Sequence, residues 1–173
     1  MMSDATDTAR RRARFEALCG HLRPDLYRFA FWLARDRAVA EDVVQDTLLR
    51  AWRSLDGLGE DAAARPWLLT IARREFARRF ERKRFETVDV EELAAVEDPA
   101  LGAADAEELA ELREALFALE DDYREPLVLQ VLMGYSTDEI ARHMDLKPGA
   151  VLTRLFRARQ KLRIALAGSG EAK

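Results

Sequence analysis

Apolar residues recur every three or four positions along almost the whole of this 173-residue chain, which is the spacing of an amphipathic α-helix. No segment shows the strict alternation of apolar and polar residues that is typical of a half-buried β-strand. The helical pattern stops once, over residues 85–107, where the sequence becomes acidic and alanine-rich and contains Pro99 and Gly102. The sequence therefore predicts an all-α fold of two small helical domains joined by an acidic, flexible linker.

This pattern also predicts where each segment lies. In chain order we expect an N-terminal tail over 1–14, a first helical domain over 15–84, the linker over 85–107, a second helical domain over 108–166 and a C-terminal tail over 167–173. In the first domain we expect a helix that breaks at Pro24, a second helix from there to Ala34, and further helices over 40–55 and 66–83. Pro66 suits the first turn of the last of these helices.

The composition excludes several classes of protein. A single cysteine, Cys19, rules out an internal disulfide framework, and we expect its side chain to act as a small packed hydrophobe. The two histidines do not form a zinc-binding pattern, so we expect no metal and no other cofactor. No apolar run approaches the ~18 residues that a membrane-spanning helix needs, and the N-terminus does not resemble a signal peptide. We therefore expect a cytoplasmic protein without direct membrane insertion.

The net charge of −4 conceals an uneven distribution. Residues 87–120 carry eleven acidic side chains and one basic side chain. By contrast, residues 73–84 hold seven basic side chains against two acids, and residues 147–163 hold six with no acid. Binding to an anionic partner depends on such local clusters rather than on the total charge, so nucleic acid is a plausible ligand.

Residues 134–163 predict a helix-turn-helix. Ser136 and Glu139 have the spacing of a capping box that begins a short helix. Asp145 stands where the turn needs a left-handed or otherwise unusual residue, and Pro148 and Gly149 begin a second, longer helix. A short helix, a tight turn and a longer helix are the arrangement with which many proteins read the major groove of DNA.

The second helix of this motif is basic. Arg154, Arg157, Lys161 and Arg163 leave its polar faces, and guanidinium groups can bind phosphates or read guanine edges. Thr153 and Phe156 can contact bases or thymine methyl groups. The alternative is an ordinary solvated helix face, but an acid-free basic helix directly after such a turn favours DNA binding.

Three ordered segments resemble the extracytoplasmic-function (ECF) sigma factors of bacterial RNA polymerase. AEDVVQDTLLRAW at 40–52 is similar to the helix that binds core polymerase, RPWLLTIARREFARR at 65–79 to the helix for the −10 promoter element, and PGAVLTRLFRAR at 148–159 to the −35 recognition helix. The resemblance covers roughly residues 15–84 and 108–166. It implies a non-enzymatic subunit that directs core RNA polymerase to promoter DNA and is held inactive by an anti-sigma factor.

The resemblance also implies a role for individual residues. It places Asp42, Gln45 and Asp46 against the clamp of the largest polymerase subunit, with the polymerase flap as the other docking surface for the chain. It gives contacts with the opened −10 strand to the loop 56–66, Trp67, Arg73, Arg74 and Arg78. It implies that the −35 element is contacted by Thr137, Asp138, Leu152, Thr153, Arg154, Phe156 and Arg157. Two alternatives stay open: an exposed acidic helix face for the first set, and a core position for Trp67.

The chain departs from the family pattern at several positions. Arg74 and Arg78 stand where the family commonly has asparagine and aspartate, and Leu152 replaces a basic residue early in the recognition helix. Asp145 replaces a glycine of the turn, and Glu120 replaces a proline. Promoter preference therefore does not transfer from relatives. For the acidic linker, mimicry of nucleic acid near the polymerase active channel and a merely solubilising tether are equally open.

Three other functions are weaker alternatives. A stand-alone helix-turn-helix regulator that binds its operator as a dimer would explain the second domain but not the motifs of the first. A small helical enzyme would use Glu41, Asp42 and Asp46, but neither a histidine nor a nucleophile accompanies them. A purely structural interaction protein has no use for two arginine clusters.

Overall fold

The computed structural model describes residues 2–83 and 106–170, and the remaining residues lie outside this description. All regular secondary structure in these two ranges is helical, which confirms the all-α prediction. The chain divides into two compact units, Met1–Val90 and Glu91–Lys173. Most of the predicted linker, residues 85–105, falls outside the described residues.

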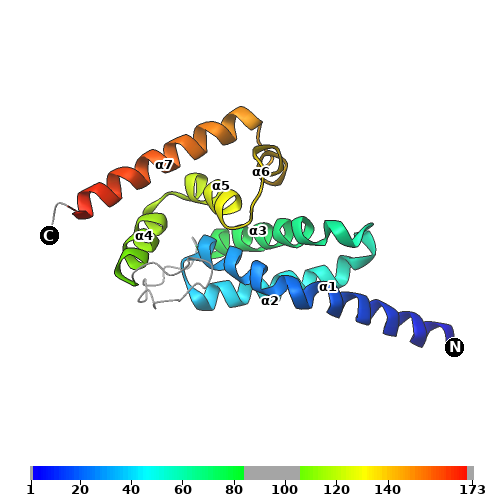
Figure 1. Cartoon of the computed structure of the whole chain (residues 1–173). Coiled ribbons are helices and arrows are strands. Elements are labelled where there is room, and N and C mark those ends of the chain that lie inside the picture. The colour runs from blue at the N-terminus through cyan, green and yellow to red at the C-terminus, as the bar shows by residue number, and fades with distance from the viewer. Residues whose placement is uncertain (1, 84–105, 171–173) are drawn as a thin grey trace. The chain divides into compact units, whose positions relative to one another are not determined.

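The N-terminal unit contains three long helices, α1 (Met2–Ala34), α2 (Arg37–Ser54) and α3 (Ala64–Lys83), each in contact with the other two (Figure 1). Two short 3₁₀ turns, η1 (Leu55–Gly57) and η2 (Asp61–Ala63), connect α2 to α3. The side chain of Asp36 caps α2 by accepting a 2.8 Å hydrogen bond from the Val39 amide. This cap fixes the start of α2 and hence the direction of the acidic side chains that follow.

The predicted helix break at Pro24 is wrong, because α1 continues through this residue. A proline inside a helix costs ~3 kcal/mol through a lost hydrogen bond and a steric clash. The residues that follow it bury large side chains, among them Phe29 and Trp32, which are fully buried. Each such burial is worth about 1.5–3 kcal/mol, so packing of this face offsets the cost of the proline.

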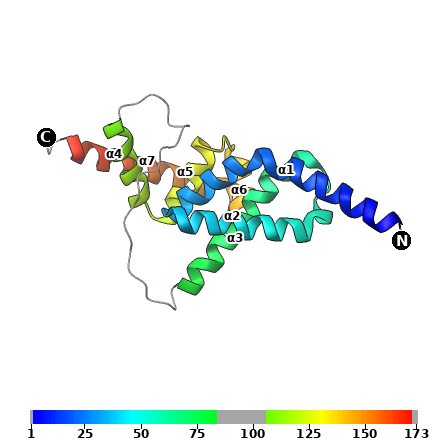
Figure 2. The same cartoon turned by 90° about the horizontal axis from the view of Figure 1, so that it is seen from below.

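The helix α1 also begins much earlier than expected. It starts at Met2, so the segment 1–14 that we expected to be a tail is the first part of α1. Its N-terminal end extends past the connection between α2 and α3 (Figure 2). The guanidinium of Arg11 lies 4.8 Å from the centroid of the Trp52 ring and donates a 2.9 Å hydrogen bond to the Trp52 carbonyl oxygen. The C-terminal end of the segment 1–14 is thereby anchored to α2.

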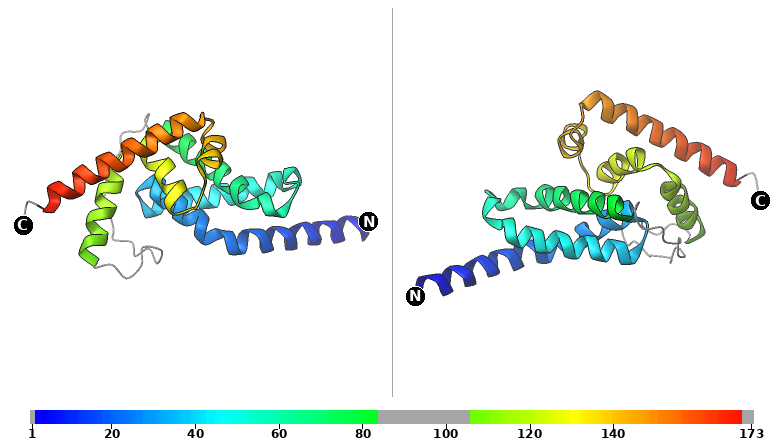
Figure 3. Two further views of the ribbon diagram at one scale, coloured as in Figure 1. Left: turned by 45° about the horizontal axis from the view of Figure 1, so that its top comes forward. Right: turned by 180° about the vertical axis from the view of Figure 1, so that it is seen from behind.

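The C-terminal unit contains α4 (Ala106–Ala118), α5 (Asp121–Val131), α6 (Thr137–Met144) and α7 (Pro148–Gly170). The long helix α7 contacts the other three. Figure 3 shows the course of these helices from two further sides. Arg124 on α5 is completely buried and donates to the carbonyl oxygens of Leu119 at 2.5 Å and Phe117 at 3.5 Å. It also pairs with Asp121. This one side chain satisfies carbonyl groups at the end of α4, where a helix leaves them without internal partners.

The predicted helix-turn-helix is confirmed as a local structure. Ser136 and Glu139 form both halves of the capping box at the start of α6. Asp145 ends α6 in the left-handed conformation, with φ 55° and ψ 49°. Three side chains that share the inner faces of α6 and α7 are almost fully buried: Ile140, Val151 and Leu155. This packing fixes the outer face of α7 relative to α6.

Candidate functional site

The predicted polymerase-contacting residues lie on the outer side of α2. Asp42 and Gln45 are exposed, and Asp46 is partly exposed. Since α2 begins at Arg37, these acids stand in its second and third turns rather than in its first turn. Asp42 and Asp46 are four residues apart and therefore lie on one helix face.

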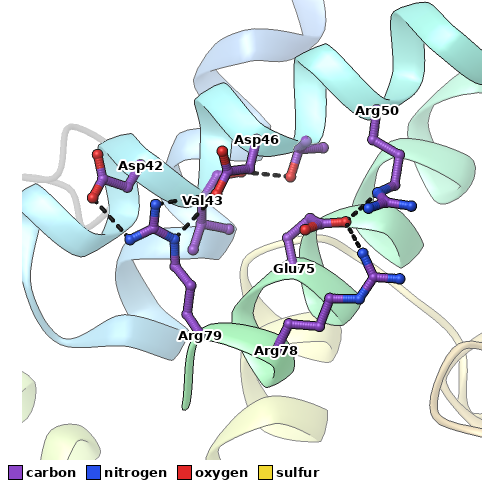
Figure 4. A network of polar contacts seen from close by, with 8 residues as sticks. Asp42, Val43, Asp46, Arg50, Glu75, Arg78 and Arg79 are labelled. Atoms are coloured by element: carbon purple, nitrogen blue, oxygen red, sulfur yellow. Dashed lines mark hydrogen bonds and ion pairs between the residues drawn. The ribbon is translucent and has the colours of Figure 1, made fainter. Parts of the chain in front are cut away.

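Both acids are paired with an arginine of α3 (Figure 4). Arg79 donates from Nη1 to Asp42 Oδ2 at 2.9 Å and from Nη2 to Asp46 Oδ2 at 3.1 Å. Its Nε lies 3.2 Å from the same Asp46 oxygen. Only one oxygen of each carboxylate takes part in these bonds. Because two carboxylates face one guanidinium, the patch keeps a net negative charge. The second oxygen of each carboxylate is available to a cationic partner.

A second cluster with the charges reversed lies beside the first (Figure 4). Glu75 of α3 is 10% exposed, and one of its oxygens, Oε1, lies 2.5 Å from Arg50 Nε and 3.1 Å from Arg78 Nη1. Arg50 and Arg78 are each about half exposed. A recessed carboxylate thus holds two solvent-facing guanidinium groups, one from each helix.

The residues predicted for the −10 strand differ in how accessible they are. Arg74 is exposed and makes no hydrogen bond or ion pair with another described residue. Arg78 is held by Glu75, and Arg73 is partly buried. Trp67 is partly buried against the core cluster around Leu55, which favours the core alternative for this ring.

The loop predicted to meet the opened strand is anchored by α1. Arg14 donates to Asp61 Oδ1 at 2.9 Å and to the Leu58 carbonyl oxygen at 3.1 Å. Arg11 pairs with Asp56 at 3.3 Å. Two arginines of the segment that we expected to be a tail therefore fix both ends of the loop that joins α2 to α3.

The outer face of α7 presents an apolar and basic surface. Leu152 and Phe156 are 57% and 67% exposed, although both are large hydrophobic residues. Arg157 is exposed and makes no hydrogen bond or ion pair with another described residue. Thr153 is also exposed, but its hydroxyl donates a 3.0 Å hydrogen bond to the Gly149 carbonyl oxygen. Exposed aromatic and aliphatic groups beside a free guanidinium suit contact with base edges and phosphates.

The remaining predicted −35 residues lie at the edges of this face. Arg154 pairs with Asp122 of α5 at 3.0 Å and is 27% exposed, so it also fastens α7 to α5. At the start of α6, Asp138 is exposed and Thr137 is partly buried. Further along α7, Lys161 pairs with Glu120 at 2.9 Å, and this hydrogen bond holds the pKa of Glu120 below its usual value.

Four residues with clear structural roles were absent from the predicted sites: Arg14, Arg50, Glu75 and Arg79. The order Asp42, Asp46, Arg50 at intervals of four was visible in the sequence and indicates one helix face. The α3 partners of these residues could not be identified from the sequence, because pairing across two helices depends on their register. No group of three or more potential metal-ligating side chains lies together in the described ranges. Likewise, none of the described helices is long and apolar enough to cross a membrane.

The fold has two helical units. One carries a helix-turn-helix and the other an arginine-rich surface, and this combination is typical of DNA-binding proteins. Comparison with family models places it more closely, since residues 18–86 match Sigma-70 region 2 and residues 109–162 match Sigma-70, region 4. The ECF RNA polymerase sigma factor SigL of Mycobacterium tuberculosis is 34% identical over 145 residues, which is 82% of each chain. SigM of Bacillus subtilis is 30% identical over 149 residues, covering 80% of this chain and 86% of SigM. The chain belongs to the ECF family of RNA polymerase sigma factors.

Solved structures agree with this assignment. The sigma factor RpoE from Bartonella quintana, in complex with the anti-sigma factor NepR, matches 88% of this chain and 96% of its own with a TM-score of 0.77 and 30% identity. CnrH, in complex with the cytosolic domain of CnrY, matches 89% of this chain and 88% of its own with a TM-score of 0.65 and 29% identity. As a sigma factor, the chain binds core RNA polymerase and directs transcription initiation at promoters.

Proposed function

We propose that the two units divide promoter recognition between them, with no catalysis by the chain itself. The C-terminal unit reads the −35 element as a duplex, and the N-terminal unit binds core polymerase and the opened −10 element. The observation that best supports this proposal is the outer face of α7. There Leu152, Phe156 and Arg157 are exposed on the second helix of a helix-turn-helix.

The shape of α7 supports major-groove reading. Gly149 and Ala150 lie in its first turn and are small, which allows a close approach to base edges. Phe156 and Leu152 supply apolar contacts suited to thymine methyl groups, while Arg157 supplies a guanine or phosphate contact. Thr137 and Asp138 at the start of α6 and Arg154 on α7 border this surface.

In the N-terminal unit, Asp42, Gln45 and Asp46 dock on the clamp of the largest polymerase subunit. Their net negative charge calls for a basic partner surface. Arg73, Arg74 and Arg78 follow on α3 and bind the opened strand, with the anchored loop 56–66 and Trp67 beside them. The polymerase flap is the corresponding docking surface for the C-terminal unit.

We further propose that the protein works in the cytoplasm under the control of an anti-sigma factor. The solved structure of RpoE from Bartonella quintana is that of a sigma factor in complex with the anti-sigma factor NepR, and CnrH is in complex with the cytosolic domain of CnrY. An anti-sigma factor silences the chain if it covers either the α2 acids or the outer face of α7.

Run-off transcription tests the proposal. Purified bacterial core polymerase, with and without this chain, transcribes a library of promoter fragments from the source genome. We expect selective initiation that is lost in Asp42→Ala/Asp46→Ala and in Phe156→Ala/Arg157→Ala. Glu41→Ala is the matched control, because Glu41 is an exposed acid of the same helix that makes no described ion pair.

The opposing result would be duplex binding by the chain alone, with two symmetric half-sites and no dependence on polymerase. That outcome would contradict the proposal and support the stand-alone dimeric regulator.

A further inference from the structure

We propose that Arg50 and Arg78, joined through Glu75, form a phosphate-binding site that takes one backbone phosphate of the promoter strand. Arg50 is thereby a DNA-contacting residue on α2, the helix otherwise assigned to polymerase. This inference rests on the proposed function, because it assumes that the strand reaches α3.

The geometry brings the two guanidinium groups together. Both contact the same oxygen, Glu75 Oε1, at 2.5 Å and 3.1 Å, so the two nitrogen atoms cannot be further apart than the sum of these distances (Figure 4). Arg50 uses Nε and Arg78 uses Nη1 for these contacts. The terminal Nη groups of Arg50 therefore remain as donors, and a guanidinium carries five N–H groups in all.

The charge distribution favours an anion. One carboxylate between two guanidinium groups leaves a net positive charge on the cluster. Glu75 is only 10% exposed, whereas Arg50 and Arg78 are 49% and 48% exposed, so an approaching ligand meets the cations first. Arg74, which is exposed on the preceding turn of α3, adds to the positive potential. Oriented arginine pairs of this kind are suited to the oxygens of a phosphate group.

The position of Arg50 on α2 selects DNA rather than polymerase as the source of the anion. Asp42, Asp46 and Arg50 follow one another on one face of α2, and the sign of the charge changes after Asp46. The acidic part of this face suits a basic polymerase surface. The basic part lies against Arg78, which the proposed function already assigns to the promoter strand.

The salt dependence of promoter binding tests the site. Holoenzyme assembled from the full chain is titrated onto a labelled promoter fragment whose −10 region is single-stranded, over a range of salt concentrations. We expect Arg50→Gln to weaken binding about three- to tenfold. The slope of log K against log salt should become shallower by about 0.7, the value for one phosphate on a single strand.

Three variants control this measurement. Arg53→Gln removes an exposed arginine from the same helix that makes no described ion pair, and it should leave the slope unchanged. Arg50→Lys keeps the charge and should keep most of the slope. Arg50→Gln/Arg78→Gln should lose no more slope than either change alone, because both side chains bind one phosphate. A melting curve and a core-binding titration for each variant confirm that the holoenzyme forms.

The site is contradicted if Arg50→Gln binds promoter with the slope of the unchanged protein. It is equally contradicted if Arg50→Gln weakens the affinity for core polymerase while the slope on DNA stays the same, since Arg50 would then contact an acidic polymerase surface. If the unchanged holoenzyme fails to bind any promoter fragment, the proposed function fails instead, and the two failures are thus distinguishable.

Discussion

The two units present the side chains of their proposed sites in different states. On the N-terminal unit, the acids assigned to polymerase are bonded to Arg79, and Arg78 is bonded to Glu75. On the C-terminal unit, Leu152, Phe156 and Arg157 face solvent without polar partners among the described residues. The charged side chains of the first surface are mostly paired within the protein, with Arg74 as the exception, whereas on α7 only Arg154 and Thr153 among the proposed contact residues have a partner in the described ranges.

This difference shows that the two surfaces bind at different cost. A ligand of α7 meets side chains whose contacts are not already taken. A ligand of α2 or α3 must share or displace an ion pair within the protein. Half-exposed ion pairs are worth roughly 0–1 kcal/mol, so the exchange is easy but measurable. The N-terminal surface is therefore the one on which a variant can improve binding.

The largest expected effect is a loss of stability that is confined to the C-terminal unit. Arg124→Ala leaves carbonyl groups at the end of α4 and the paired Asp121 without their buried partner. We expect a loss of ~3 kcal/mol in the free energy of unfolding of the C-terminal unit, with no change in the N-terminal unit. Hydrogen exchange measured peptide by peptide reports both units at once. Arg163→Ala, an exposed change on α7, is the control, and equal loss of protection in both units would contradict the separation.

The second effect concerns the open face of α7. Phe156→Ala and Arg157→Ala should each weaken binding of holoenzyme to a −35 duplex about tenfold, since one good base contact is worth roughly 1–3 kcal/mol. Arg154→Ala should reduce DNA affinity less and lower the melting temperature as well, because Arg154 pairs with Asp122. Affinity and melting temperature are measured on the same three proteins. A larger loss of affinity for Arg154→Ala than for Arg157→Ala would reverse the assignment.

A smaller effect tests the paired surface of the N-terminal unit. Arg79→Gln removes the cation that neutralises Asp42 and Asp46, so we expect core polymerase to bind about threefold more tightly, within the range for a half-exposed ion pair. Asp42→Ala should change the affinity in the opposite direction. A fluorescence titration of labelled chain with core polymerase gives both values. Weaker binding by Arg79→Gln would show that Arg79 positions the acids rather than competing for them.

The last prediction concerns the interior of the N-terminal unit. Burial raises the pKa of the Cys19 thiol to about 11 from an ordinary value of 9.0. Because the folded state favours the protonated thiol, its contribution to stability is complete below pH 9.0 and is lost as the pH rises towards 11. Iodoacetamide at pH 8 should label Cys19 only after unfolding in urea. Val131→Cys in a Cys19→Ala background is the exposed control on the C-terminal unit, and rapid labelling of native Cys19 would contradict its burial.

The sequence predicted the C-terminal unit better than the N-terminal one, for a physical reason. The capping box at Ser136 and the left-handed Asp145 depend on neighbouring residues, so local chemistry identifies them. The continuation of α1 through Pro24 depends on packing of Phe29 and Trp32 against other helices, which no local rule includes. The family resemblance suggested candidate positions on both units without revealing which of them are paired.

The pairings between α2 and α3 could not be predicted because they need the register of two helices. Glu75 shows the consequence. In the sequence it is one of two acids in a basic segment, while in the structure it is the recessed carboxylate that joins Arg50 to Arg78.

Permanganate reactivity of unpaired thymines in the −10 region tests most directly the claim that the units divide promoter recognition. Holoenzyme with the unchanged chain should make these thymines reactive. Arg74→Ala/Arg78→Ala should still protect the −35 duplex from nuclease yet leave the thymines unreactive, whereas Phe156→Ala/Arg157→Ala should lose −35 protection and recover thymine reactivity at high holoenzyme concentration. Normal opening by Arg74→Ala/Arg78→Ala would contradict the division of roles.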